Sequence, residues 1–214
     1  MDITLYYAPS TCALAPYVTL TEAGAKFQVR SLNYRKREHF TPEYLKINAK
    51  HKVPSLVVDG RVLTENVAIH LWVHRTFPAA KLLPADPWSE AQAISLHGWC
   101  ASGIHPYLSR VGSPGKVVED PAAHESVVKL ATEALLENFQ FGDEQLAGRE
   151  YFFDHFTAPD AHFFWCCRRA KQLKVDISGF RNVAAHYKRI EARPSVNKFL
   201  AFEKEVNEGF AKAG

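Results

Sequence analysis

The chain has 214 residues, a formal net charge of +3, and 47% hydrophobic residues. This length allows one large or two small domains with a sizeable core. The charge is small and no long basic run is present, so we expect no nucleic-acid binding. No apolar run approaches the roughly 20 residues of a membrane span, and no signal-peptide pattern opens the chain. We therefore expect a cytoplasmic protein without a membrane partner.

A cysteine follows the first predicted strand. Residues 3–7 are β-branched and aromatic, which is typical of a strand, and residues 13–23 form an apolar helical run that Ser10 or Thr11 can cap. Cys12 would then lie in the first helical turn, where free backbone N–H groups and the helix dipole favour a thiolate. The pattern predicts a nucleophile of lowered pKa. The alternative is a buried and unreactive cysteine.

The following elements complete a mixed α/β half. Alternating side chains predict a second strand over residues 26–32, and a short helix comes next. Asp59-Gly60 is a strong hairpin signal, so the strands on either side of it should be antiparallel neighbours. A further helix should end before Pro78, because proline cannot continue it. The predicted order is βαβαββα.

The chain then changes character and becomes helical. Residues 79–88 are rich in proline and alanine without any apolar period, which indicates a linker. We therefore predict one domain over residues 1–78 and an all-α domain over residues 89–214. No repeat or low-complexity tract interrupts either part.

Capping residues mark the helices of the second half. Ser89 with Gln92 fits a capping box at the start of a long helix, in which Pro106 should cause a kink. Thr157 with Asp160 forms a second box, followed by an apolar stretch. That helix is expected to be the central core helix of the second half.

The four cysteines do not form a recognisable framework. Their spacing matches neither a paired zinc motif nor a small disulfide scaffold, so we expect reduced thiols and no metal. Ala15 stands where a second cysteine of a dithiol motif would fall, which leaves only monothiol chemistry for Cys12. Trp99, Tyr107 and Trp165 could line an apolar pocket, although core packing is the commoner role of such residues.

Several short motifs jointly carry a family resemblance. The βαβαββα half, with its early cysteine and a proline before the hairpin, has the layout of a thioredoxin-like domain. The whole chain resembles the cytosolic glutathione S-transferase family, most closely its bacterial cysteine-containing (beta) class. The motifs are Tyr-Tyr-x-Pro-x-x-Cys-x-Leu-x-Pro at residues 6–16, Val53-Pro54, Leu-Thr-Glu-Asn-Val-Ala-Ile at residues 63–69, His105, and Phe-Thr-x-x-Asp at residues 156–160.

The resemblance implies a glutathione site in the first domain. Pro54 matches the family's cis-proline, which turns the backbone N–H and C=O of Val53 toward the cysteinyl part of glutathione. Glu65 would accept the γ-glutamyl ammonium, and the N–H of Asn66 would receive the γ-glutamyl carboxylate. The glycyl carboxylate would meet one of three basic side chains: Arg37, Lys36 or Lys52.

The resemblance also implies the remaining site residues and the activity. His105 matches the histidine that faces the cysteine in the beta class, and Ser102 lies one turn before it. Ser10 is a second candidate for activating a thiol. We expect a homodimeric transferase that joins glutathione to a small electrophilic substrate, either through glutathione's own activated thiol or with thiol-disulfide exchange at Cys12. The alternatives are a non-catalytic partner-binding module and a glutathione-dependent reductase or dehalogenase.

Overall fold

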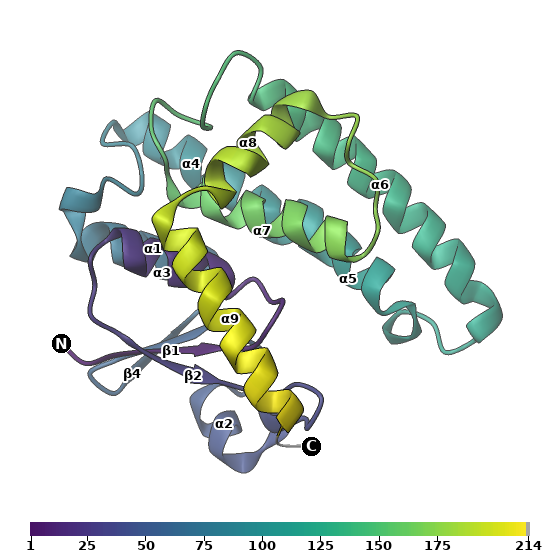
Figure 1. Ribbon diagram of the computed structural model, residues 1–214, viewed down its shortest axis with the longest axis horizontal. Coiled ribbons are helices and arrows are strands. Elements are labelled where there is room, and N and C mark those ends of the chain that lie inside the picture. The colour runs from purple at the N-terminus through teal and green to yellow at the C-terminus, as the bar shows by residue number, and fades with distance from the viewer. Residues whose placement is uncertain (213–214) are drawn as a thin grey trace. The chain divides into compact units, whose positions relative to one another are not determined.

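The computed structural model describes residues 1–212. The N-terminal part of the chain forms a four-stranded mixed sheet (Figure 1). Its strands are β1 (Ile3–Tyr7), β2 (Gln28–Ser31), β3 (Ser55–Val58) and β4 (Arg61–Thr64), in the order β2-β1-β3-β4. β1 runs parallel to β2 and antiparallel to β3, and β3 and β4 form the predicted hairpin. Leu5 lies opposite Val29 and Leu56 in this register.

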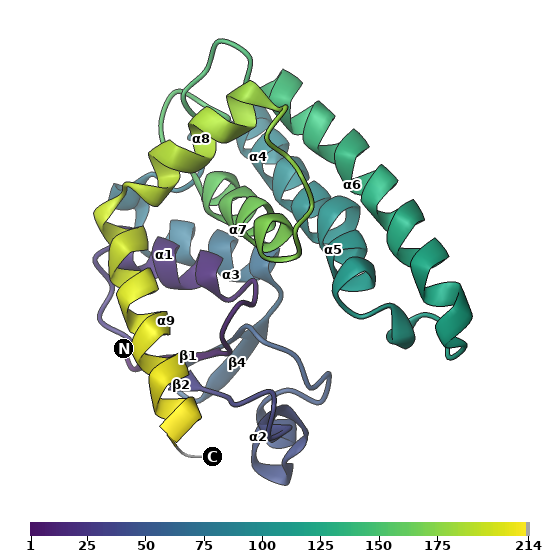
Figure 2. The ribbon, with the colours of Figure 1, turned by 45° about the vertical axis from the view of Figure 1, so that its right-hand side comes forward.

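Helices cover both faces of the sheet. The helical segments of this part are α1 (Leu14–Glu22), η1 (Glu38–Phe40), α2 (Pro42–Ile47), α3 (Asn66–Thr76) and η2 (Pro78–Ala80). Figures 1 and 2 show α1 and α3 together on one face and α2 on the other. Ile3, Leu5 and Tyr7 are buried, as the two-residue period of a strand requires. The predicted βαβαββα order is confirmed, and with it the thioredoxin-like domain followed by helices.

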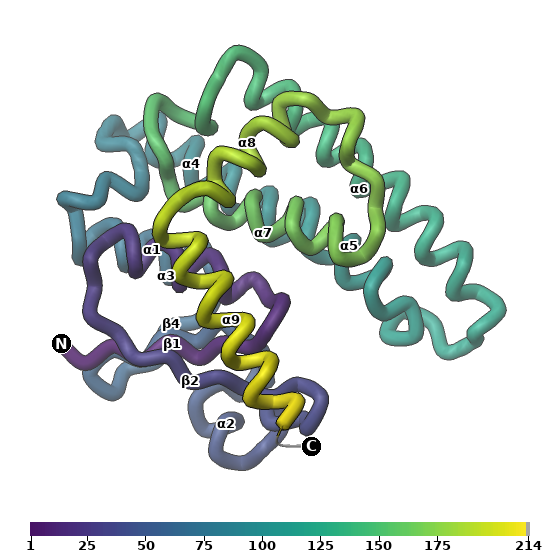
Figure 3. Tube along the Cα trace, viewed as in Figure 1, coloured from purple at the N-terminus to yellow at the C-terminus, as the bar shows by residue number. Residues whose placement is uncertain are grey.

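The last helix packs against the sheet unit. By contacts, the chain divides into one compact unit of residues 1–85 together with residues 192 onward, and a second unit, Asp86–Glu191. α9 (Pro194–Lys212) packs its Phe199 and Phe202 rings against Tyr17 at 5.2 and 5.3 Å between centroids, and Figure 3 traces this return of the chain to α1. Because of its position in the chain, this last helix is predicted to belong to the all-α domain, residues 89–214. Its aromatic face instead finds its partners on α1.

An ion pair fixes the same junction within the first unit. Arg193 donates from Nε and Nη2 to the two carboxylate oxygens of Glu22 at 2.9 and 2.8 Å. Such a two-pronged arginine contact holds direction as well as distance, so it aligns the start of α9 with the end of α1.

The stretch that the sequence predicts to be a linker contains two buried residues, Leu82 and Leu83, with exposed fractions of 0% and 2%.

The second unit is entirely helical. Its elements are α4 (Pro87–Trp99), η3 (Cys100–Ile104), α5 (His105–Gly112), η4 (Pro114–Lys116), η5 (Pro121–Ala123), α6 (His124–Gln145), α7 (Ala158–Gln172) and α8 (Arg181–Glu191). α7 is buried along most of its length, and the rings of Phe139, Phe152 and Trp99 surround its Phe163 at 5.3 to 6.0 Å. It is the central helix that the sequence predicts.

Pro106 produces a local change of helical pitch. η3 is a π-helical turn that joins α4 to α5, and the N–H of His105 bonds to the carbonyl of Cys100, five residues back. Proline has no N–H to offer to the carbonyl four residues before it, so the wider turn takes up the break without ending the helix. The predicted kink therefore takes the form of a π-turn.

Two predicted helix caps have different outcomes. The Thr157–Asp160 capping box is present in both directions at the start of α7. The box predicted at Ser89 is wrong, because the cap of α4 is Asp86, whose Oδ2 accepts from the N–H and the hydroxyl of Ser89 at 2.9 Å. A carboxylate is as good a cap as a serine hydroxyl, and Pro87 suits the first helical position.

Candidate functional site

The loop before α1 does not have the predicted cap. α1 begins at Leu14, so Cys12 lies just before the helix and not in its first turn. Thr11 donates its hydroxyl back to the carbonyl of Ala8 at 2.6 Å, and Ser10 adopts a left-handed backbone with a φ of 63°. The prediction that Ser10 or Thr11 caps the helix is wrong, because both residues are used to form the turn that leads into it.

Cys12 is buried among polar backbone groups of the first unit. Its side chain lies 3.9 Å from the carbonyl oxygen of Val53, and Asn66 donates from Nδ2 to the carbonyl of Cys12 at 3.3 Å. Burial raises the pKa of the Cys12 thiol to about 12, against a lowering by the Asn66 side chain. The predicted lowering is wrong, since only 6% of Cys12 is exposed and loss of solvent outweighs the helix end.

The raised pKa predicts how Cys12 reacts with pH. A thiol alkylates as its thiolate, so modification should be slow at neutral pH and rise about tenfold per pH unit without levelling off before pH 10. Peptide mapping after timed treatment with iodoacetamide measures this rate, with N-acetylcysteine in a separate tube without protein as the control for the reagent. A plateau below pH 9 would show that the thiolate is stabilised in the folded protein.

The Val53–Pro54 peptide is cis, as the resemblance implies. The loop before it is tied down from one side, because the Asn48 amide donates to the carbonyl of Lys52 at 2.7 Å and to the Ser55 hydroxyl at 3.2 Å. The N–H of Val53 donates to the hydroxyl oxygen of Tyr34 at 3.2 Å. Both polar backbone groups of Val53 therefore face side chains of the first unit, Tyr34 and Cys12.

Glu65 and Asn66 occupy the start of α3. Glu65 is the residue before the helix, with a φ of 73° and a side chain that is 70% exposed. Lys50 donates to its carboxylate and, at 2.8 Å, to the hydroxyl of Thr64. Sequence reasoning missed Lys50, because the pair joins residues 15 positions apart through the fold of the hairpin. Asn66 is buried and faces Cys12 through the contact described above.

The three basic candidates have different surroundings. Arg37 places its guanidinium over the Phe40 ring at 4.7 Å from the centroid. The backbone N–H of Lys36 donates to the side-chain oxygen of Asn33 at 3.2 Å, and the residue as a whole is exposed. The positive charge of Lys52 acts on Cys12 and lowers the pKa of that thiol, although less than burial raises it. Lys52 is thus the candidate that is electrostatically coupled to the cysteine.

A buried glutamate from α9 anchors the Cys12 loop. Oε1 of Glu203 accepts from the hydroxyl of Tyr7 and from the backbone N–H of Ser10, both at 2.8 Å. Only 4% of Glu203 is exposed. Sequence reasoning missed this residue as well. The sequence gives only weak evidence for a buried Glu203. A single glutamate in an amphipathic helix is normally assumed to be solvent-exposed unless the apolar face of that helix is known.

The second unit holds the other predicted side chains. His105 begins α5, and its ring contacts Trp165 at 4.5 Å between centroids. Ser102 is exposed in the π-turn and donates to the carbonyl of Gly98 at 2.8 Å. Trp99 donates to Asn138 at 2.7 Å and stacks on Phe163, so its role is packing. The approach of His105 and Ser102 to a bound thiol stays a prediction.

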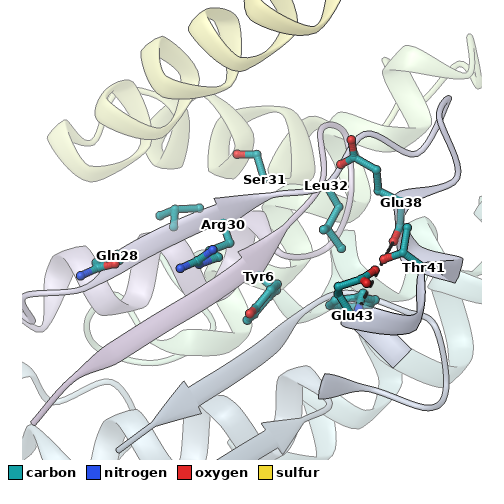
Figure 4. A pocket seen from close by; sticks show the side chains of 10 residues that line it. Tyr6, Gln28, Arg30, Ser31, Leu32, Glu38, Thr41 and Glu43 are labelled. Carbon is teal, nitrogen blue, oxygen red and sulfur yellow. Dashed lines mark hydrogen bonds between the residues drawn. The ribbon is translucent and has the colours of Figure 1, made fainter. Parts of the chain in front are cut away.

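A cavity of about 660 Å³ opens beside the edge strand β2 of the first unit (Figure 4). Its lining is polar and of mixed charge, with Arg30, Glu38 and Glu43 among the side chains. Tyr6 reaches it because alternate β1 residues point to opposite faces. None of the described residues that line it belongs to the predicted glutathione site, so the cavity contributes nothing to that site.

Two kinds of feature are absent from residues 1–212. No group of three metal-ligating side chains from His, Cys, Asp and Glu gathers at one point in this range. Within the same residues, no helix has both the length and the apolar character that crossing a membrane requires.

Comparisons with known proteins agree with this architecture. Residues 1–75 match the family model of the glutathione S-transferase N-terminal domain, and residues 103–194 match that of the C-terminal domain. The chain is 30% identical over 203 residues to glutathione S-transferase GstA of Escherichia coli O157:H7, covering 93% of this chain and 98% of that protein. The chain therefore belongs to the glutathione S-transferase family.

Two solved structures of bacterial glutathione transferases are similar to this chain in fold. A glutathione transferase homologue from Sulfitobacter with bound glutathione matches with a TM-score of 0.87 at 25% identity, covering 94% of this chain and 97% of that one. A bacterial beta class glutathione S-transferase from Sphingomonas chungbukensis matches with a TM-score of 0.82 at 29% identity, covering 94% and 98%. A beta class protein is thus among the solved structures that this chain resembles.

Proposed function

We propose that the protein binds glutathione beside Cys12 and transfers its thiol to small electrophilic, apolar substrates. The observation that carries this is the meeting of three segments in the first unit. Cys12, before α1, contacts both of the others: its Sγ lies 3.9 Å from the carbonyl oxygen of Val53, before β3, and its carbonyl accepts from Asn66, at the start of α3, at 3.3 Å. These segments supply a thiol, the backbone N–H and C=O of Val53 and a helix N-terminus, which suit the cysteinyl and γ-glutamyl parts of glutathione.

The state of Cys12 favours one of the two possible chemistries. At neutral pH a thiol whose pKa is raised to about 12 is protonated, so it is a poor nucleophile for exchange with a disulfide. A protonated thiol can still donate a weak hydrogen bond. We therefore assign the attacking sulfur to glutathione, with Cys12 as a neutral neighbour that orients it, and we assign the electrophile to apolar side chains of the helical unit.

Glutathione itself provides the first test. Calorimetry should detect binding, and a panel of aromatic halides, epoxides and enones should show which electrophiles are consumed with glutathione. Substitution Glu65→Ala should weaken glutathione binding roughly tenfold or more, because an ammonium–carboxylate hydrogen bond contributes about 1.5–3 kcal/mol. Conjugation at saturating glutathione should change much less than affinity.

A matched substitution controls for loss of charge at a helix start. Glu125 is the acidic residue in the first turn of α6, in the other unit, and Glu125→Ala should leave the affinity unchanged. Equal affinity of Glu65→Ala and the unaltered protein would remove Glu65 from the site. Absence of both glutathione binding and conjugation would instead favour the non-catalytic partner-binding module. A reduced or dehalogenated product that carries no glutathionyl group, formed together with glutathione disulfide, would favour the reductase or dehalogenase. A homodimer and a cytoplasmic location stay predictions.

A further inference from the structure

The N–H of Val53 already has a partner in the protein. Tyr34 accepts this hydrogen bond at 3.2 Å through its hydroxyl oxygen. In the function proposed above, the same N–H pairs with the cysteinyl carbonyl of glutathione. One N–H makes one strong hydrogen bond, so the Tyr34 hydroxyl and a ligand carbonyl compete for it. When no ligand is bound, the contact also keeps a backbone donor satisfied on a residue that is only 8% exposed.

The surroundings of Tyr34 hold its backbone and leave its side chain able to move. The side-chain oxygen of Asn33 accepts from the N–H groups of Arg35 and Lys36 at 3.0 and 3.2 Å, which fixes the turn after β2. Tyr34 itself is 36% exposed. A rotation about its side-chain bonds would therefore carry the hydroxyl away from Val53 into solvent without unfolding the turn.

Ring stacking favours the position in which the hydroxyl meets Val53. Tyr34 stacks on His39 at 4.0 Å between centroids, and His39 contacts Phe40 at 4.3 Å. Phe40 in turn stacks on His51 at 4.5 Å, two residues before Val53. This row of four rings joins the loop after β2 to the loop before β3, so the position of Tyr34 is coupled to that of the Val53 backbone.

We propose that Tyr34 is a gate on the glutathione site: its hydroxyl occupies the N–H of Val53 in the empty protein and leaves when a peptide carbonyl takes its place. An amide carbonyl is a stronger acceptor than a phenol oxygen, so a peptide-like ligand can displace the hydroxyl where a ligand without a backbone carbonyl gains nothing. The gate therefore selects for an extended peptide group next to the thiol.

The apparent affinity for glutathione equals the intrinsic affinity multiplied by the fraction of molecules in which the gate is open. Burial raises the pKa of the Tyr34 hydroxyl, more than the hydrogen bond from Val53 lowers it, so the group is a neutral phenol at neutral pH. Breaking a neutral hydrogen bond before binding lowers the apparent affinity by about threefold to tenfold. Tyr34→Phe keeps the ring and its stacking on His39 but cannot accept from Val53, so it removes this competition.

The test compares glutathione binding by the unaltered protein and Tyr34→Phe. Calorimetry should give a dissociation constant about threefold to tenfold lower in the variant, and stopped-flow mixing should place the gain in the association rate, with dissociation unchanged. Tyr187→Phe is the control, because it removes a hydroxyl that donates to Glu191 at 2.9 Å in the other unit. That variant should bind like the unaltered protein.

Each outcome decides the proposal. Equal or weaker binding by Tyr34→Phe, with normal binding by the unaltered protein, would overturn the gate and leave the glutathione site in place. Weaker binding in particular would mean that the hydroxyl contacts the ligand directly. If neither protein binds glutathione, the proposed function fails and the gate fails with it. A denaturant unfolding curve for each protein confirms that the compared samples are folded.

Discussion

Replacing Asp160 with alanine should lower the free energy of unfolding by roughly 3–5 kcal/mol, as expected when one partner is removed from a buried polar network. One carboxylate oxygen accepts from Thr157 N–H and its hydroxyl at 2.8 and 2.7 Å. The other accepts from the N–H of Phe152 and from Nε2 of His186 at 3.1 and 2.9 Å. The substitution would leave these donors buried without this acceptor, which costs more than the loss of a helix cap alone.

Denaturant unfolding followed by circular dichroism measures this effect. Asp86→Ala is the matched control, since Asp86 caps α4 through the same kind of contact to Ser89 but is exposed to solvent, where water can replace the carboxylate. Its midpoint should shift far less. Asp160→Asn should fall between the two, because an amide oxygen can still accept on one side. Similar midpoints for Asp160→Ala and Asp86→Ala would contradict a network centred on Asp160.

Replacing Glu203 with alanine should have the second large effect, on both stability and the reactivity of Cys12. Two hydrogen bonds to a buried carboxylate contribute about 1.5–3 kcal/mol each, so the loss should be roughly 3 kcal/mol or more. The Ser10 N–H would lose its anchor, and the loop that carries Cys12 would open more often. Alkylation of Cys12 by iodoacetamide at pH 8 should therefore become faster.

Two variants separate this anchor from a general effect on α9. Glu205 lies on the exposed side of the same helix, so Glu205→Ala should unfold at nearly the same midpoint and leave Cys12 protected. Glu203→Gln keeps one acceptor oxygen and should recover part of both properties. If Glu203→Ala loses stability while Cys12 remains as protected as before, Glu203 supports packing only and does not hold the loop.

Local chemistry accounts for what the sequence predicted well. The strand before the cysteine, the hairpin at Asp59-Gly60 and the Thr157–Asp160 box depend on residues within about four positions of one another, and all three are present. The helix at Ser89 was placed correctly, but its cap was assigned to the wrong residue. Asp86 and Ser89 are both good capping residues, and only the backbone direction decides between them.

Contacts between distant segments account for what was missed. Tyr34 with Val53, Lys50 with Glu65, and Glu203 with Ser10 are separated by 19, 15 and 193 positions, so no local pattern announces them. The pKa of Cys12 was predicted in the wrong direction for the same reason. A helix end can be predicted from the local sequence. The burial of the thiol instead depends on segments that are distant in the chain, such as those of Val53 and Asn66.

The return of α9 to α1 has a consequence for the newly made chain. The turn at Ser10 emerges early in synthesis, but its acceptor on Glu203 is made 193 residues later. At about 5–20 residues per second, the wait is on the order of 10–40 s. During that time the N–H of Ser10 and the hydroxyl of Tyr7 lack this acceptor, and the aromatic face of α1 that later meets α9 stays uncovered. On the ribosome, the thiol-bearing half is therefore the first part to be made and the last to be completed.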